Sequence, residues 1–186
     1  EMQTVANRST YLEELMFHFG RYLLISSSRE NSLPAALQGV WSQYDYTPWT
    51  GGYWHNINVQ MNYWGAMSAN LAETFIPYIK FYKAYLPAAE KAATSYISEN
   101  YPDRVSSETG ANGWIIGTGA NAFFFPPPGG HSGPGTGGFT GKLLMEYYNF
   151  TQDKEYLREV AYPSMLSLSK FFSKTLVQEG DKLLVY

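Results

Sequence analysis

The sequence of 186 residues carries 16 acidic and 13 basic side chains, which gives a formal net charge of −3 at pH 7. This balance provides no basic field that would attract nucleic acid or an anionic membrane surface, and it favours a neutral partner. Aromatic residues make up 17% and charged residues 16%, against roughly 25% charged residues in an ordinary soluble domain. The composition therefore excludes intrinsic disorder and fits one domain with a sizeable core.

The sequence contains no cysteine. Disulfides, thiol nucleophiles and Cys-ligated metals are excluded, and the redox compartment stays open, so secretion is allowed. No run of about 18 apolar residues could span a membrane. The chain begins EMQTVANRST, without a signal segment, and stops within the strand-like run KLLVY. We expect residues 1–186 to be a single fragment of a longer polypeptide that is secreted or extracytoplasmic.

The first half of the chain shows helical spacing in three places. A helix is predicted from Tyr11 to about Ile25, and a loop rich in tryptophan follows to about Asn58. A second helix is predicted from about Gln60 to Tyr82, and Pro77 should kink or split it. A third is predicted from Pro87 to Glu99, with alanines on one face. The first helix should bury one stripe of side chains, consisting of Leu12, Leu15, Met16, Phe19 and Leu23.

The second half combines a Gly/Pro-rich segment with further helices. The segment from Asn112 to Gly141 contains Trp114–Ile116 and Phe123–Phe125, which are too apolar for a solvated tether, so a packed functional loop is predicted. Helical spacing resumes at Leu143, and Pro163 should open a last helix that Gly180 ends. The pattern predicts an all-α fold of about six helices in antiparallel pairs.

The densest polar and aromatic cluster surrounds Asn56 and Asn58. If the chain is extended before the second helix, both amides point the same way and could enter one cleft. Amides donate and accept hydrogen bonds without titrating, so they can orient a water molecule or a carboxylate. The alternative is that one of the two asparagines caps the helix that begins near Gln60.

Four tryptophans in the expected loops could stack on the C–H faces of a sugar, namely Trp41, Trp49, Trp54 and Trp114. The alternative for each of them is an ordinary position in the core. The three histidines are scattered, and no phosphate-binding loop is present, so neither a metal site nor a cofactor is expected. No recognisable pair of carboxylates stands near these loops.

Several stretches in order resemble the catalytic domain of glycoside hydrolase family 95, the α-L-fucosidases. They are FGRYLLISSSR from Phe19, LPAALQGVW from Leu33, Pro48-Trp49, NINVQMNYW from Asn56, Gly113-Trp114 and YYNFTQDKEYL from Tyr147. The resemblance covers nearly the whole chain. It implies an (α/α)6 toroid of six helical hairpins, of which this chain would form about half.

The resemblance also implies a reaction, the inverting hydrolysis of terminal α-L-fucosides or related α-L-galactosides in glycans. By motif position Asn56 and Asn58 would help an Asp to activate water, while the general acid and base would lie beyond this chain. Gln38, Trp41, Trp49, Trp54, His55 and Trp114 would bind the oligosaccharide substrate.

Two departures from the family pattern affect residues expected to touch substrate. Where members carry His two positions before the first Asn, this sequence has Trp54, with His55 displaced by one. Where many members have a His-rich turn after Gly-Trp, this sequence reads IIGTGANAFFF. Two other functions stay open, a non-catalytic carbohydrate-binding module and a helical interaction scaffold.

Overall fold

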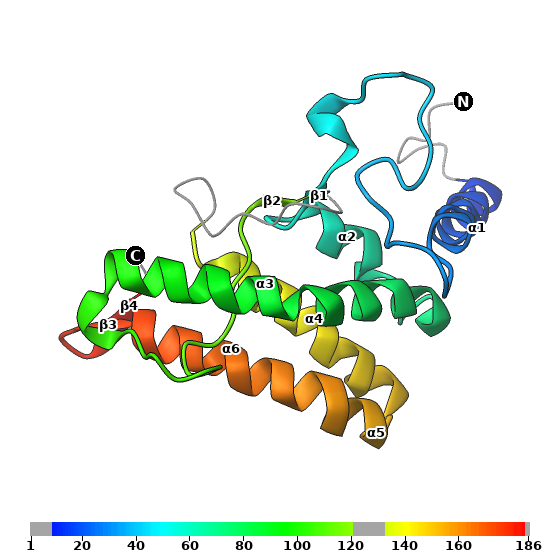
Figure 1. Cartoon of the computed structure of the whole chain (residues 1–186). Helices are drawn as coiled ribbons and strands as arrows, with labels where there is room; N and C mark the ends of the chain where they lie inside the picture. Colours follow the sequence, from blue (N-terminus) through cyan, green and yellow to red (C-terminus); the bar gives the residue numbers. More distant parts are fainter. Residues whose placement is uncertain (1–8, 121–132, 185–186) are drawn as a thin grey trace.

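The computed structural model describes residues 9–120 and 133–184, and these are mostly helical, which confirms the all-α prediction (Figure 1). The helices are α1 (Thr10–Ser27), α2 (Asn58–Trp64), α3 (Ile76–Asn100), α4 (Gly135–Thr151), α5 (Lys154–Tyr156) and α6 (Tyr162–Thr175). Shorter turns are η1 (Pro48–Gly51), η2 (Ala72–Phe75), η3 (Pro102–Arg104) and the π-helical η4 (Leu157–Ala161). Two antiparallel pairs of short strands complete the fold, β1 (Tyr53–Trp54) with β2 (Gly119–Ala120) and β3 (Val177–Glu179) with β4 (Lys182–Leu184).

The core lies where α3, α4 and α6 pack together (Figure 1). Aromatic rings fill it in contact with one another, and the Tyr78 ring lies 4.6 Å from Phe75 and 4.4 Å from Tyr82, measured between centroids. The predicted face of small residues on α3 is buried, since Ala89 and Ala93 are both fully inaccessible. Large rings at one end and alanines at the other give α3 a continuous buried side.

The boundaries predicted for α3 were wrong. The break in the chain comes after α2, where Gly65 ends the helix, and Pro77 lies in the first turn of α3 instead of splitting a helix. A proline is tolerated in a first turn because its missing N–H would have no partner there. Pro87, predicted to begin a new helix, lies inside α3. Its ring is exposed, and packing on the opposite side of α3 outweighs the lost backbone hydrogen bond.

The start of α4 also differs from the prediction. The helix begins at Gly135, well before Leu143, although its first turns are rich in glycine. A Cβ at Gly137 would lie 3.2 Å from the Leu168 side chain, and one at Gly141 would lie 2.9 Å from it. These glycines therefore let α4 approach α6 closely, at a cost in helix propensity.

The last helix begins as predicted, with Pro163 in its first turn, but it ends at Thr175. Gly180, predicted as the stop, lies instead between β3 and β4 with a φ of +62°. The run Trp114–Ile116 is fully buried, which confirms packing at the start of the Gly/Pro-rich segment. The predicted Phe123–Phe125 cluster lies outside the described residues.

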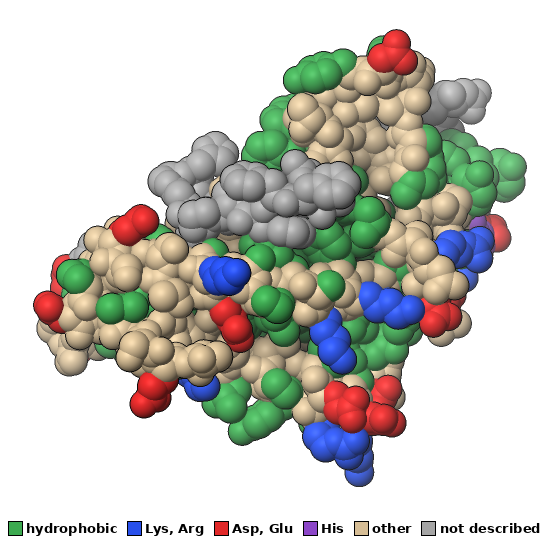
Figure 2. Space-filling model, viewed as in Figure 1, with side chains coloured by type: hydrophobic (Ala, Val, Ile, Leu, Met, Phe, Trp, Pro, Cys, Tyr) green, Lys and Arg blue, Asp and Glu red, His purple; other side chains and the backbone are tan. Residues whose placement is uncertain are grey.

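Helix α1 forms where predicted, and the Ser9 hydroxyl accepts a hydrogen bond from the Leu12 N–H at its start. The buried stripe was wrong, because Met16 is 72% and Phe19 is 56% exposed. Figure 2 shows hydrophobic side chains gathered around this helix at the right of the view. The C-terminal half of α1 meets the rest of the described chain, where the Arg21 guanidinium donates to the Ala69 carbonyl. None of the described helices is long and apolar enough to cross a bilayer.

Candidate functional site

The Asn-Ile-Asn segment forms a turn between the β1–β2 pair and α2. Strand β1 pairs with β2, and just after it the His55 N–H donates to the Thr118 carbonyl at 2.6 Å. Asn56 lies in the turn that follows and is exposed, whereas Asn58 is the first residue of α2 and is half-buried. Both amides therefore lie at one end of α2, beside the β1–β2 pair.

Neither sequence argument about this pair describes the backbone correctly. The extended lead-in was wrong, because β1 ends at Trp54 and the residues after it form a turn. The capping alternative was wrong too, because the N-cap of α2 is Ile57 and no side chain makes a capping hydrogen bond there. The two amide side chains are thus not used to satisfy the start of the helix.

The loop that carries Gln38 and Trp41 is fixed to the core by two tyrosines. The Tyr53 hydroxyl donates to the Pro34 carbonyl at 3.0 Å, and the Tyr63 hydroxyl accepts from the Ala35 N–H at 2.7 Å. The Ser28 hydroxyl lies 2.6 Å from the Tyr63 hydroxyl. Because Ser28 donates its one proton to the Thr74 carbonyl, the Tyr63 hydroxyl is the donor in the bond between the two side chains. Burial raises the pKa of Tyr63 to about 12, so the phenol is neutral at pH 7 and can make both hydrogen bonds.

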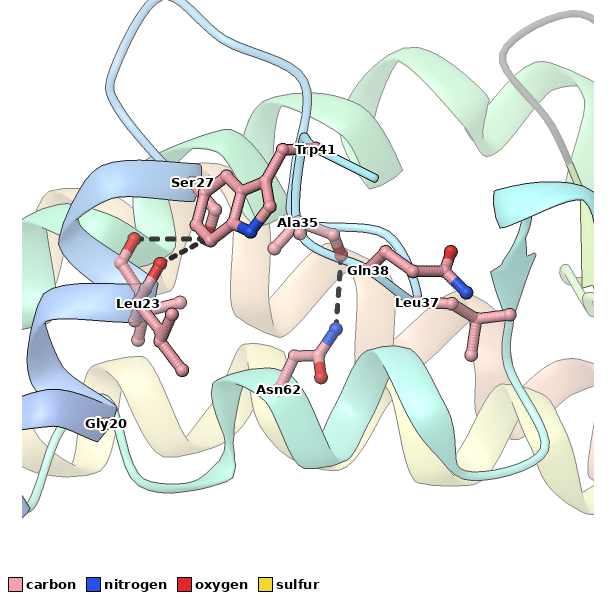
Figure 3. A pocket seen from close by; sticks show the side chains of 10 residues that line it. Gly20, Leu23, Ser27, Ala35, Leu37, Gln38, Trp41 and Asn62 are labelled. Carbon is pink, nitrogen blue, oxygen red and sulfur yellow. Dashed lines mark hydrogen bonds between the residues drawn. The ribbon is translucent and has the colours of Figure 1, made fainter. Parts of the chain in front are cut away.

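A cavity of about 410 Å³ opens between α1, this loop and α2 (Figure 3). Gln38 and Trp41 line it from the loop, and Asn62 lines it from α2. The Asn62 amide donates to the Ala36 carbonyl at 2.9 Å and so ties the loop to the helix. Because Asn58 and Asn62 are four residues apart, they lie on the same face of α2, one turn from each other. The wall of the cavity at Asn62 is therefore one helical turn from Asn58.

A second loop carries Trp49, leads into Trp54 of β1 and meets the first loop at Gln38. Trp49 and Thr50 in η1 have positive φ angles of 53° and 56°, in a region that residues other than glycine rarely adopt. The Trp49 carbonyl accepts from the Gly52 N–H at 3.2 Å and from the Trp54 indole at 3.3 Å, which stabilises this strained turn. A Cβ at Gly51 would lie 3.5 Å from the Gln38 side-chain oxygen, so the two loops meet there.

The tryptophans of the two loops differ in what they present to solvent. Trp49 is 67% exposed and Trp41 is 48% exposed. The Trp54 ring is half-buried and covers Gly119 of β2, where an added Cβ would lie 3.3 Å from the indole. Exposed indoles on anchored loops offer apolar faces suited to the C–H surface of a sugar.

Two predicted site residues belong to the core instead. Trp114 is 2% exposed, and its indole donates to the Ser164 carbonyl at 2.8 Å, so its ring has no face open to a ligand. His55 is 1% exposed and packs against Tyr82, with ring centroids 5.6 Å apart. Burial lowers the pKa of His55 to about 4, and the nearby Gly117 backbone opposes this only in part. The imidazole is therefore neutral at pH 7.

Sequence reasoning missed the residues that support the site. Tyr53, Tyr63 and Asn62 hold the Gln38–Trp41 loop, and the fully buried Gln60 donates to the His55 carbonyl at 2.6 Å. Tyrosine and amide side chains within an apolar helical pattern were the signal that could have revealed them, because a buried polar group requires a partner.

The charged groups of the described residues lie away from the site interior. None of the described Asp and Glu side chains is buried. Within the same ranges no three His, Cys, Asp or Glu residues come together as a metal site. The arrangement of amides, hydroxyls and indoles suits a neutral ligand with many hydroxyl groups.

The sequence matches the glycosyl hydrolase family 95 catalytic domain over residues 1–186. It is 33% identical over 178 residues to alpha-L-fucosidase 2 of Arabidopsis thaliana, covering 93% of this chain and 20% of that protein. It is 31% identical over 182 residues to probable alpha-fucosidase A of Aspergillus niger, covering 91% of this chain and 21% of that protein. A relative from Aspergillus oryzae, also named probable alpha-fucosidase A, is 40% identical over 128 residues, which cover 66% of this chain and 15% of that protein.

The chain thus spans about a fifth of the length of the first two relatives. The match extends over both halves of the fold, including the Asn-Ile-Asn turn and the loops beside it. The mostly helical structure agrees with the six-hairpin helical fold of this family. The chain belongs to glycosyl hydrolase family 95, and its residues match the catalytic domain of that family.

Proposed function

We propose that the full-length protein hydrolyses terminal α-L-fucosides or related α-L-galactosides in glycans, with inversion at the anomeric carbon. Asn56 and Asn58 orient the attacking water and its base, and Gln38, Trp41, Trp49 and Trp54 contact the sugar. The proposal is supported by family membership and by relatives named as fucosidases.

The observation that carries the proposal is the exposure of Asn56 on an anchored turn. Its neighbours His55 and Val59 are buried, and the His55 N–H is bonded to the Thr118 carbonyl just before β2, so the turn is fixed while the Asn56 side chain faces outward. A rigid amide can hold a water molecule in one orientation, which lowers the entropic part of the barrier.

The general acid and base are proposed to come from outside these 186 residues. Inverting hydrolysis requires two carboxyl groups about 6.5 to 9.5 Å apart across the sugar. The described carboxylates are exposed or half-buried, and Asp153, for example, caps α5 by accepting from the Glu155 and Tyr156 N–H groups. We therefore expect this chain alone to give no turnover of an aryl α-L-fucoside.

The remaining parts of the full-length protein are also proposed to cover the exposed apolar side of α1. That side includes Leu15, Met16 and Phe19, and it borders the cavity through Gly20 and Leu23. A partner there would complete one wall of the sugar site. We propose a secreted or extracytoplasmic location for the protein, which fits a glycan substrate.

Trp54 is proposed to set the sugar preference. An indole donates one hydrogen bond and accepts none, and here its N–H is already bonded to the Trp49 carbonyl. It therefore offers the sugar a mainly apolar surface. We expect Trp54→His in the full-length protein to increase kcat/KM for an aryl α-L-fucoside by a few fold, because an imidazole can hydrogen-bond a ring hydroxyl that the indole cannot. An unchanged kcat/KM would show that Trp54 does not contact the sugar.

The test of the reaction is hydrolysis of an aryl α-L-fucoside by the full-length protein, followed by proton NMR of the first product. Initial release of β-L-fucose would support inverting hydrolysis, and initial release of the α-anomer would contradict it. The 186-residue chain, assayed in parallel, should be inactive.

A carbohydrate-binding module without catalysis is the second candidate, favoured by the exposed rings of Trp41 and Trp49. It predicts fucoside binding by the full-length protein in calorimetry with no product formed. Trp41→Ala should weaken that binding in both cases, so product formation is what separates the two functions.

A further inference from the structure

Gln60 is a buried amide at the base of the Asn-Ile-Asn turn. The side chain is fully inaccessible to solvent, and its Nε2 donates to the His55 carbonyl at 2.6 Å and to the Thr140 hydroxyl at 3.1 Å. The orientation of the amide follows from the first contact, because only the nitrogen can face a carbonyl oxygen. Gln60 therefore joins the turn before α2 to helix α4.

The His55 carbonyl belongs to the peptide unit whose nitrogen is that of Asn56. Peptide units are planar, so a hydrogen bond to this oxygen fixes the plane that leads into the Asn56 Cα. The preceding peptide is held from the other side, where the His55 N–H donates to the Thr118 carbonyl at 2.6 Å. The two bonds together determine the direction in which the backbone enters the turn.

The same hydrogen bond also relates Asn56 to Asn58. Gln60 lies on α2, two residues after Asn58, and its amide reaches back to the peptide before Asn56. The bond closes a ring of covalent and hydrogen bonds that contains both asparagines. This ring restricts how far the Asn56 backbone can rotate relative to Asn58.

A purely structural role leaves one feature of Gln60 unexplained. Its Oε1 is buried without a hydrogen-bond partner among residues 9–120 and 133–184, although a buried acceptor without a partner costs about 1 to 3 kcal/mol. An apolar side chain of similar size would fill the same space without this cost. Packing alone therefore does not account for an amide at this position, whereas the hydrogen bond that it donates to the His55 carbonyl does.

We propose that Gln60 is a positioning residue that sets the mutual orientation of Asn56 and Asn58 through the His55 carbonyl. The inference rests on the proposed function, in which this pair orients the attacking water. Gln60 is too deeply buried to touch substrate, so its effect reaches the reaction only through the turn.

The experiment uses the full-length protein and the variants Gln60→Met and Gln60→Asn. Methionine keeps the volume and removes the donor, and asparagine keeps the amide but shortens the side chain by one methylene group. Tyr156→Phe is the matched control, because it removes another buried hydrogen bond, from the Tyr156 hydroxyl to the Leu144 carbonyl, far from the turn. Steady-state kinetics on an aryl α-L-fucoside, Tm, and hydrogen exchange of the peptide that covers residues 55–58 are measured for each.

Both Gln60 variants should lower kcat about 10- to 100-fold with KM within about twofold, as for misplaced reacting groups. Tyr156→Phe should lower Tm by a similar amount and leave kcat within twofold of the unmodified protein. Exchange over residues 55–58 should become faster in the Gln60 variants only. Equal kcat values for the Gln60 variants and the control at matched Tm would overturn the proposal.

Failure of the proposed function gives a different result. If the unmodified protein does not hydrolyse the fucoside, the fucosidase proposal fails, whereas the exchange measurement still decides the role of Gln60. Unchanged exchange over residues 55–58 in both Gln60 variants would show that this amide does not hold the turn.

Discussion

The α3–α4–α6 core and helix α1 respond in opposite ways to the same kind of sequence pattern. Both contain apolar side chains at helical spacing, yet Tyr78 of α3 is fully buried and Met16 of α1 is 72% exposed. In the core each helix has neighbours on the side that its pattern marks as apolar. Helix α1 meets the described chain mainly at its C-terminal end, through Arg21, Leu24 and Ser28. Periodicity therefore identifies the side that a helix needs to bury, but it does not supply the partner.

The largest contrast between the two regions should come from a pair of glycines. Gly113 has a φ of +70°, and an added Cβ would lie 2.6 Å from the Phe171 backbone nitrogen in α6. Gly113→Ala combines strain with overpacking and should reduce the free energy of unfolding by about 4 kcal/mol. Gly20 lies inside α1, and an added Cβ there would have nothing within 4 Å. Gly20→Ala should increase the free energy of unfolding by about 0.5 to 1 kcal/mol through helix propensity.

Urea unfolding of both variants, followed by circular dichroism, measures this contrast. Similar midpoints for the two variants would mean that α6 does not approach Gly113 as closely as the structure places it.

Two histidines give the next contrast, through pH. The pKa of His55 is about 4 in the folded protein and about 6.5 when the chain is unfolded. The folded-state value is lowered, so the unfolded chain binds the proton first and stability falls as pH decreases from 6.5 towards 4. The loss should reach about 3 kcal/mol below pH 4. His55→Gln should remove this part of the pH dependence.

His18 of α1 is the control, because its side chain is 61% exposed. His18→Gln, measured at pH 7 and pH 4.5 beside His55→Gln, changes an exposed side chain and should alter the free energy of unfolding at pH 7 by no more than about 0.5 kcal/mol. An unmodified chain that loses no more stability than His55→Gln over this range would show that the His55 ring reaches water.

A substitution on the exposed side of α1 should have the smallest effect on the free energy of unfolding. Its effect on self-association should be larger. Phe19→Ser changes an exposed side chain and should alter the free energy of unfolding of the 186-residue chain by no more than about 0.5 kcal/mol. The same change should weaken self-association, because an exposed apolar patch promotes it. Sedimentation velocity at several concentrations checks this. A chain that is monomeric at every concentration, with or without Phe19, would show that the exposed side of α1 needs no partner.

Much of the fold followed from the sequence because local rules were sufficient. The limits of α1 and the start of α6 at Tyr162–Pro163 agree with helical spacing and with proline in a first turn. The continuation of α3 through Pro87 was not predicted. A proline ends a helix only when tertiary packing stabilises the helix by less than the lost backbone hydrogen bond costs. The early start of α4 was hidden by its glycines, whose role is visible only beside Leu168 of α6.

The residues proposed for the site from the sequence and the family resemblance remain a prediction, and the structure adds where they lie. Asn56 and Asn58 lie at the start of α2, and Gln38 and Trp41 line a cavity that α2 also borders through Asn62. Trp114 was also assigned to the site, whereas its burial and its hydrogen bond to the Ser164 carbonyl make it a core residue. Long-range hydrogen bonds of this kind have no local sequence signature, so the partners of Tyr63 and Gln60 could not be predicted.

Steady-state kinetics of the full-length protein carrying Asn56→Ala or Asn58→Ala measures whether the Asn-Ile-Asn turn serves the proposed reaction. Each change should lower kcat on an aryl α-L-fucoside by about 100-fold, with KM within about threefold and little change in Tm, because the amides act mainly in the transition state. Asn100→Ala, an exposed change at the end of α3, should leave kcat unaltered. Near-normal kcat in both turn variants, at the Tm of the unmodified protein, would show that neither amide takes part in the reaction.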